Sequence, residues 1–350
     1  MLKQIWILII LLGTTFAAVT GQLSSSDQEL GYFDQIEFFS HEEELSLAEA
    51  RDLQSSDWKS APADNLSLGF DKDHYWFRLP LKNLHASDTQ WLFRSKYPLL
   101  DTFDLYLFAD SILIEEFHTG DTLPFEQRPL NQPSFVFPLT IATDAEYVIY
   151  MHVHTTSSLQ LSLSLQSESS FWQTMATENA TSAAFYAILI SMIFYNAVIF
   201  LIVRVRSYLY YVLYLSSFTL FMASIHGWAY RLLWPNSPAI HQLSVVFLIG
   251  TTICAAGLFT TSFLRLKEVR PDLHRIVITV GMIGLLQSVI SLFLSYAIMI
   301  RVGAGLAIFA AAIAMFSTMQ EWFRSRRREV MMFIIAWTTV LIGFLLYSGQ

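Results

Sequence analysis

The chain has 350 residues, of which 54% are hydrophobic, and a formal net charge of −8 at pH 7. So much apolar content excludes a single soluble domain, and the acidic balance excludes the basic surface on which nucleic-acid binding depends. The charge is unevenly distributed, because residues 23–180 hold 8 Lys and Arg against 25 Asp and Glu, whereas residues 181–350 hold 12 against 4. We therefore expect two bodies, an acidic one followed by an apolar and basic one.

The first 21 residues have the pattern of a secretory signal peptide. Lys3 precedes an apolar run, Ile5–Leu12, and small residues follow as far as Gly21. An uncleaved signal anchor is the alternative, and it predicts the same topology. The only cysteine, Cys254, lies in an apolar stretch and is expected to be a packing residue. The exported part therefore has no disulfide and needs a core of its own.

Residues 23–166 alternate apolar and polar side chains in short runs, which predicts β-strands. The most regular run is Leu159–Leu165, where four leucines share one face. Turn residues at 109–110 and 119–121 separate other runs. This pattern predicts an antiparallel sandwich with one solvent-facing side per sheet, interrupted by one helical element at 42–53. The runs expected to form strands are 76–81, 104–108, 111–117, 134–139, 147–154 and 159–165.

Residues 167–181 are mostly polar and are expected to form a connector. Beyond them, 183–347 holds six apolar stretches of about 20 residues, the length that crosses a hydrocarbon core of about 30 Å. We expect a multi-pass bundle in which glycines 281, 284, 303 and 305 permit close helix packing. The predicted spans are 183–203, 208–228, 243–264, 277–296, 302–322 and 331–347.

The basic residues between the spans predict the orientation in the membrane. If the signal peptide exports the sandwich, the inner loops hold ten Lys and Arg and the outer side holds two, Arg231 and Arg301. This is the positive-inside asymmetry of a multi-pass membrane protein whose N-terminal domain lies outside the cytoplasm. Six spans return the chain to the outer face at Gln350, so we expect either a fragment or a protein whose inner surface is three basic loops.

Five polar and aromatic residues of the predicted sandwich are candidates for binding a small polar ligand. Aromatic faces, guanidinium donors and carboxylates together suit a sugar or an organic acid. Core positions are the alternative for the aromatic members. The candidate ligand-binding residues are Trp76, Arg78, Tyr97, Asp101 and Arg128.

No catalytic or metal-binding pattern emerges from the sequence. His152 and His154 lie on one side of a predicted strand and could share a metal, but no third ligand accompanies them, so a structural role is favoured. The sequence has no nucleophile elbow, no zinc-protease motif and no P-loop. We therefore expect a chain that is not an enzyme and that uses no cofactor.

The order of motifs resembles the bacterial 7TMR-DISM family, seven-transmembrane receptors with diverse intracellular signalling modules. The sandwich is similar to the second type of extracellular domain in that family, and the membrane part is similar from about residue 183 onward. The stretches that carry the resemblance are Tyr75–Leu79, Tyr97–Tyr106, Gly120–Asp121, Arg128, Phe135–Leu139, Met192–Asn196, Arg206–Tyr214, Gly227, Leu233–Pro235 and Ala336–Trp337.

The resemblance implies a jelly-roll domain of carbohydrate-binding type that senses a periplasmic ligand. It also implies a seventh span and a cytoplasmic effector, such as a kinase or a diguanylate cyclase, both of which we expect to be missing from this sequence. Residues in the matching membrane stretches are candidates for signal relay, although a tyrosine belt at the lipid interface is the alternative for Tyr208 and Tyr211. The candidate relay residues are Tyr195, Asn196, Tyr208 and Tyr211.

The sequence thus predicts a receptor in contact with the bilayer, a small polar ligand such as a carbohydrate, and a cytoplasmic effector. A homodimer stays an open alternative for its assembly. The other functional hypothesis is a membrane-anchored binding protein or subunit that acts through its basic loops on a separate partner.

Overall fold

The computed structural model describes residues 36–61, 66–82, 90–142, 146–325 and 330–331. Leu30–Ser317 form one compact unit, and every contact reported below lies within it. The expected signal peptide at 1–21, and all but the first residue of the span expected at 331–347, lie outside the described residues.

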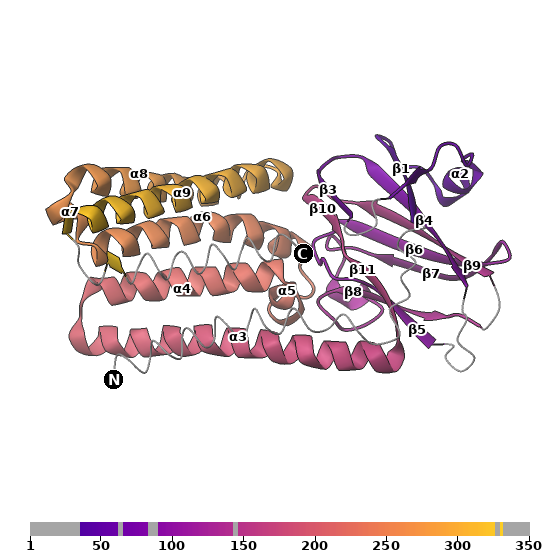
Figure 1. Ribbon diagram of the computed structural model, residues 1–350, viewed down its shortest axis with the longest axis horizontal. Coiled ribbons are helices and arrows are strands. Elements are labelled where there is room, and N and C mark those ends of the chain that lie inside the picture. The colour runs from indigo at the N-terminus through magenta and orange to yellow at the C-terminus, as the bar shows by residue number, and fades with distance from the viewer. Residues whose placement is uncertain (1–35, 62–65, 83–89, 143–145, 326–329, 332–350) are drawn as a thin grey trace. The chain divides into compact units, whose positions relative to one another are not determined.

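A six-stranded antiparallel sheet forms one layer of the N-terminal domain (Figure 1). Its strand order is β2-β1-β4-β9-β6-β7. Side chains alternate along these strands, so that Phe77, Leu105 and Met151 enter the core while Trp76, Asp104 and His152 lie on the outer face. The strands are β1 (Glu37–His41), β2 (Lys59–Ser60), β4 (His74–Lys82), β6 (Thr102–Ala109), β7 (Ile112–Thr119) and β9 (Glu146–His154).

Two smaller sheets form the opposite layer of the sandwich. One has the order β11-β5-β8, from β5 (Gln90–Ser95), β8 (Phe135–Thr140) and β11 (Leu163–Ser167). The other pairs β3 (Leu66–Phe70) with β10 (Ser158–Leu161). Aromatic side chains of both layers meet in the core, where Phe103 packs edge-on against Phe135 and Phe137.

The run Leu159–Leu165 corrects the prediction of a single strand. It is divided between β10 and β11, which pair with different neighbours. The break lies at Ser162, whose carbonyl accepts a hydrogen bond from the Lys96 amide at 3.0 Å. Leu159 and Leu161 enter the core on one side of the break and Leu165 does so on the other. The chain therefore keeps its leucines buried while it changes sheets.

The helical element of the sandwich is shorter than the predicted 42–53. It is α2 (Leu47–Asp52), and it begins where it does because Ser46 and Glu49 form a capping box. The Ser46 amide donates to the Glu49 carboxylate at 2.8 Å, and the Glu49 amide donates to the Ser46 hydroxyl at 3.4 Å. The η2 turn (Phe125–Gln127) is a second short element.

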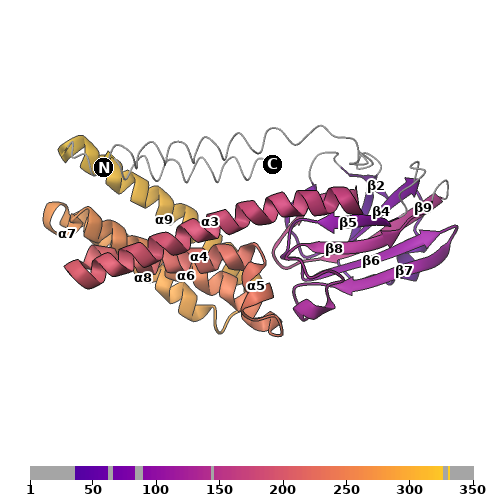
Figure 2. The same cartoon turned by 90° about the horizontal axis from the view of Figure 1, so that it is seen from below.

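The segment 167–181, predicted as a connector, is helical from Glu168 onward and continues into the first span. α3 (Glu168–Val203) is one 36-residue helix that starts directly after β11 (Figure 2). At 1.5 Å per residue such a helix is about 54 Å long, whereas the hydrocarbon core is about 30 Å thick. About 15 residues of α3 therefore extend beyond the membrane, and they join the last strand to the first span without a break.

Five helices in the described part of the chain are long and apolar enough to cross a membrane. They overlap the first five predicted spans, and each begins earlier than predicted, by 15 residues for α3 and by 2 to 6 residues for the others. These helices are α3, α4 (Arg206–Ile225), α6 (Pro238–Phe263), α8 (Pro271–Ile290) and α9 (Tyr296–Ser325). Short helices α5 (Trp228–Leu232) and α7 (Leu266–Val269) lie between them, and α6 packs against both α4 and α8.

Small and polar residues hold α6 against α8. A Cβ added at Gly284 would lie 2.9 Å from the Gly250 carbonyl, so the two backbones approach closely there. The Gln287 amide donates to the Val246 carbonyl at 3.1 Å, and the Ser288 hydroxyl donates to the Phe247 carbonyl at 2.7 Å. Gly281 and Gly303 also face neighbouring helices, whereas no atom of the described residues lies within 4 Å of a Cβ added at Gly305, so the packing role predicted for it is not seen within that part of the chain.

Candidate functional site

The two sequence-predicted ligand residues on the outer sheet face already have partners within the sandwich. Trp76 is 2% exposed, lies in a cluster with Ala50 of α2, and donates through its indole N–H to the Leu45 carbonyl at 3.2 Å. Arg78 forms an ion pair with Glu37, and its guanidinium lies 4.6 Å from the Trp58 ring centroid. Helix α2 therefore covers this part of the face.

Beside them, a row of histidines crosses β4, β9, β6 and β7. His74 Nδ1 lies 3.1 Å from His152 Nε2, and the other nitrogen of His152 lies 3.4 Å from Asp104. Asp104 also pairs with His118 at 3.1 Å. His154, which the sequence places beside His152, stacks on His74 at 4.3 Å between ring centroids. Burial, followed by the neighbouring histidines, lowers the pKa of His74.

The histidine row does not make a metal centre of the usual kind. Within the part of the chain that the structure describes, no group of three or more His, Cys, Asp or Glu is arranged to hold a metal ion. The imidazole nitrogens instead contact one another and the Asp104 carboxylate.

The other three sequence-predicted ligand residues lie elsewhere, at the end of the sandwich that contacts the helices. Tyr97 is hydrogen-bonded to Ser157 at 3.2 Å. Asp101 accepts hydrogen bonds from the Thr156 amide and hydroxyl, at 2.9 and 2.7 Å. The five predicted residues therefore do not form one site, since Trp76 and Arg78 belong to the outer face and the others to this contact.

Asp101 and Asp121 are held side by side by the backbone. The Asp121 amide donates to the Leu100 carbonyl at 2.7 Å, and the Thr122 hydroxyl donates to the Asp101 carbonyl at 2.6 Å. Between them Gly120 lies so close to Asp101 that an added Cβ would collide with its carbonyl oxygen. This close approach is the physical reason for a glycine before Asp121.

Arg128 is buried near Asp121 and among aromatic side chains. It is 6% exposed and donates to the carbonyls of Pro133 and Pro98. Its guanidinium lies 4.1 Å from the Phe135 ring centroid and 5.9 Å from that of Tyr230. Burial lowers the pKa of Arg128 to about 10, and nearby Asp121 opposes that shift. Arg128 is thus a buried cation and not an open ligand contact.

The helices contribute the other half of this contact through the segment between α4 and α6. The Tyr230 hydroxyl donates to the Leu123 carbonyl, and the Phe125 amide donates to the Pro235 carbonyl at 2.9 Å. Gln242 donates to the Asp121 carboxylate at 3.3 Å. We call this contact the loop junction: residues 97–101 and 119–135 of the sandwich against residues 227–242 of the helices.

A glycine at residue 227 allows the two sides of the loop junction to lie in close contact. Gly227 has a φ of 74°, in the left-handed region, and an added Cβ would lie 3.1 Å from the Pro133 carbonyl and 3.2 Å from the Pro98 side chain. His241 is fully buried, stacked on Tyr230 with 4.3 Å between ring centroids. Tyr230 therefore contacts the sandwich through its hydroxyl and α6 through its ring.

A second contact, the helical joint, surrounds the start of α3. Phe171 and Met175 pack with Leu92 and Val136 in one buried cluster. Arg94 of β5 pairs with Glu178 at 2.6 Å. The first turns of the helix are therefore fixed to the three-stranded sheet.

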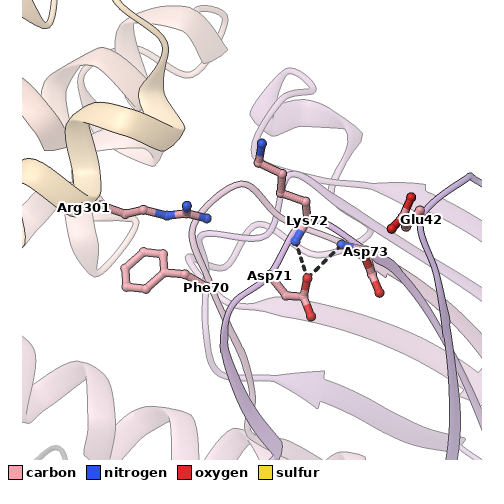
Figure 3. A pocket seen from close by; sticks show the side chains of 6 residues that line it. All are labelled: Glu42, Phe70, Asp71, Lys72, Asp73 and Arg301. Atoms are coloured by element: carbon pink, nitrogen blue, oxygen red, sulfur yellow. Dashed lines mark hydrogen bonds between the residues drawn. The ribbon is translucent and has the colours of Figure 1, made fainter.

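An open hollow of about 490 Å³ lies where residues 70–73 face Arg301 of α9 (Figure 3). The Arg301 guanidinium lies 5.4 Å from the ring centroid of Phe70, which is 47% exposed. A hydrogen bond from Tyr75 and, to a smaller extent, the charge of Arg301 lower the pKa of Asp71, so a carboxylate faces the hollow. The lining residues are Glu42, Phe70, Asp71, Lys72, Asp73 and Arg301.

The four predicted relay residues have different surroundings. Tyr195 is 65% exposed on the outer surface of α3, whereas Asn196 is buried and donates to the Met192 carbonyl at 2.8 Å. Tyr211 packs on Phe259 of α6, with 4.8 Å between ring centroids, and Tyr208 is half-buried. Tyr211 therefore contacts a neighbouring helix, while Tyr195 faces away from the bundle.

Several residues of the loop junction escaped prediction because their signal is not local. Tyr230, His241 and Gln242 follow an apolar stretch and carry no recognisable motif. Gly120–Asp121, Gly227 and Leu233–Pro235 appear only among the stretches of the family resemblance, whereas Arg128 was also predicted to bind a ligand. Their spacing along the chain did not indicate that they meet.

Comparison with known families accounts for most of the chain. Residues 34–167 match the family described as 7TMR-DISM extracellular 2, and residues 178–349 match the family described as 7TM diverse intracellular signalling. No curated protein matches the chain. The order of the two matches is the one that the sequence resemblance predicted, with the extracellular domain before the helices. The chain is therefore a multi-pass membrane protein that belongs to the 7TMR-DISM family of receptor-like signalling proteins.

Proposed function

We propose that this chain is the sensing and membrane part of a receptor in the bacterial inner membrane. Its periplasmic sandwich binds a small polar ligand, such as a carbohydrate, and the helices pass the binding event to a cytoplasmic effector. The output lies in that effector and not in a catalytic residue of this chain. The hollow between residues 70–73 and Arg301 is the observation that carries this proposal, because a ligand there would contact both the sandwich and α9.

The composition of the hollow supports a hydroxyl-rich ligand. Its volume of about 490 Å³ is within the range of small-molecule sites. Phe70 offers an exposed aromatic face, while Asp71 and Asp73 offer acceptors and Lys72 and Arg301 offer donors. Aromatic faces with carboxylates and guanidinium donors suit sugars and sugar acids.

Coupling to the helices follows from the same geometry. A ligand shifts an equilibrium only by its difference in affinity for the two arrangements. Because Arg301 belongs to α9 and Phe70 to β3, a ligand that contacts both favours the arrangement in which they are close. The unbroken α3 leaves little slack between sandwich and first span, so movement of the sandwich reaches the membrane.

The binding proposal can be tested with the full chain in lipid nanodiscs. Hexoses, disaccharides and hexuronic acids are screened by thermal shift, and we expect at least one class to raise the unfolding midpoint. Arg301→Ala and Phe70→Ala should abolish that shift. Arg231→Ala is the matched control, because Arg231 is the other outer arginine and lies over Trp228 instead. A sugar that stabilises Arg301→Ala as much as wild type would place the binding site elsewhere.

The coupling proposal needs a separate insertion experiment. A flexible Gly/Ser linker inserted between Asn179 and Ala180 interrupts α3 before its apolar part begins. With a sugar that binds wild type, hydrogen exchange at the Arg204–Ser207 turn should respond in wild type and not in the linker variant. An unchanged response would show that α3 does not transmit the signal.

A further inference from the structure

The loop junction contains an unbalanced set of buried charges. Asp101, Asp121 and Arg128 are 7%, 3% and 6% exposed. One guanidinium therefore lies near Asp121, which has a second carboxyl group, that of Asp101, beside it, and all three groups are largely removed from water. If both carboxyls were ionised, the junction would hold one uncompensated negative charge, which is costly at a buried site.

The two carboxyl groups cannot move apart to relieve this repulsion. Gly120 presses against the Asp101 carbonyl, and the Asp121 amide is bound to Leu100 at 2.7 Å. The Thr156 amide and hydroxyl hold one oxygen of Asp101, and the other oxygen is buried without a hydrogen-bond partner. Two carboxyls fixed side by side share a proton in preference to ionising together.

We propose that docking of the sandwich on the 227–242 segment is coupled to the uptake of one proton by the Asp101–Asp121 pair. The loop junction is then an acid-favoured contact that weakens as the pH rises toward neutrality. This inference concerns a proton and not the polar ligand of the hollow, so it stands or falls independently of the proposed ligand site.

The direction of the effect follows from Asp121. Burial, and then the charge of Asp101, raise its pKa from 3.8 to about 7 in the docked form. In the undocked form Asp121 is exposed to water, and its pKa returns to the ordinary range of an aspartate. Between about pH 4 and 7 the docked form therefore binds a proton that the undocked form does not. Docking is strongest below this window, weakens by up to about tenfold per pH unit within it, and levels off above it.

Other titratable groups that face the pair would respond differently. Tyr97, Tyr230 and Tyr296 carry hydroxyls, which ionise near pH 10 in water and lie outside this window. His241 is fully buried, and neither of its ring nitrogens has a hydrogen-bond partner. A proton on His241 would add a second cation near Arg128, so it would weaken docking in acid. The sign of the pH response thus separates Asp121 from His241.

Docking can be followed by distance measurements on the full chain in nanodiscs. With Cys254 replaced by alanine, spin labels are placed at the exposed positions Glu126 and Leu233, on opposite sides of the junction. From pH 5 to pH 7, the ratio of docked to undocked molecules should fall by up to about 100-fold. Asp121→Asn cannot ionise and should remain docked throughout. Asp52→Asn, which changes an exposed aspartate on α2, should behave as wild type.

A second variant tests the same proton from the helix side. The hydrogen bond from Gln242 stabilises the ionised form of Asp121 in the docked state and so lowers its pKa. Gln242→Leu should therefore weaken docking near neutral pH, and the decline in docking should continue to a higher pH before it levels off. A pH slope that persists in Asp121→Asn, or a wild-type distance that does not change with pH, would overturn the proposal. Docking that strengthens as the pH rises would also overturn the proposal. In that case His241 would be the titrating group, and His241→Gln should abolish the increase of docking with pH.

Discussion

Two of the contacts between the sandwich and the helices, the helical joint and the loop junction, differ in chemistry. At the helical joint, apolar side chains dominate: Phe171 is fully buried against Leu92 and Val136. At the loop junction, Asp101, Asp121 and Arg128 are buried. One contact is continuous with the chain through β11 and α3, whereas the other joins segments about 100 residues apart.

This difference indicates which contact can open. Apolar burial is insensitive to pH, and an unbroken helix cannot separate from the strand that it follows. Buried ionisable groups, by contrast, make the strength of a contact depend on their protonation. We therefore regard the helical joint as the fixed attachment and the loop junction as the adjustable one, and three substitutions test that distinction.

The largest effect is expected at the helical joint. Phe171→Ala removes a fully buried aromatic ring and should lower the free energy of unfolding of the sandwich by about 3–5 kcal/mol. Urea unfolding followed by tryptophan fluorescence would measure it. Phe125→Ala provides the comparison at the loop junction. Ile188→Ala is the control, because Ile188 also belongs to α3 but its side chain is 42% exposed. Equal losses for Phe171→Ala and Ile188→Ala would contradict the idea of a packed joint.

An intermediate effect is expected from Gly227→Ala. Alanine is disfavoured at a φ of 74° by about 1–2 kcal/mol, and its Cβ would press against Pro133 and Pro98. The spin-label distance should show undocking at every pH, while urea unfolding of the sandwich should not change. Gly305→Ala, which points into open space, should leave docking intact. If Gly227→Ala docks as wild type does, the close approach at this turn is unimportant.

The smallest effect is expected from the ion pair of the helical joint. Glu178 is 36% exposed but its partner Arg94 is only 6% exposed, and glutamine still offers an oxygen that accepts from the guanidinium. Glu178→Gln should therefore cost about 1 kcal/mol, and less at high salt. Lys96→Ala should have no measurable effect, because Lys96 lies 4.0 Å from Glu178 and is 53% exposed. A loss as large as that of Phe171→Ala would mean that charge, not apolar packing, holds the joint.

The sequence alone determined the order of the two bodies, most strands and the five described membrane helices. These features depend on side-chain periodicity and on runs of apolar residues, which are local properties. The distribution of arginines predicted the orientation in the membrane, which stays a prediction. The sandwich contacts Tyr230 and Gln242, in the segment that the span count places on its own side of the membrane.

Only the tertiary structure decided what the polar candidates do. Trp76 looked suited to ligand binding, but α2 folds over it, and its capping box starts that helix at Ser46. Asp101 and Arg128 are far from Tyr230 and Gln242 in sequence, and no periodicity could predict that they share one buried contact. Whether a charged residue binds a ligand, supports a loop or exchanges a proton depends on the groups that surround it, and the fold brings those groups from distant parts of the chain.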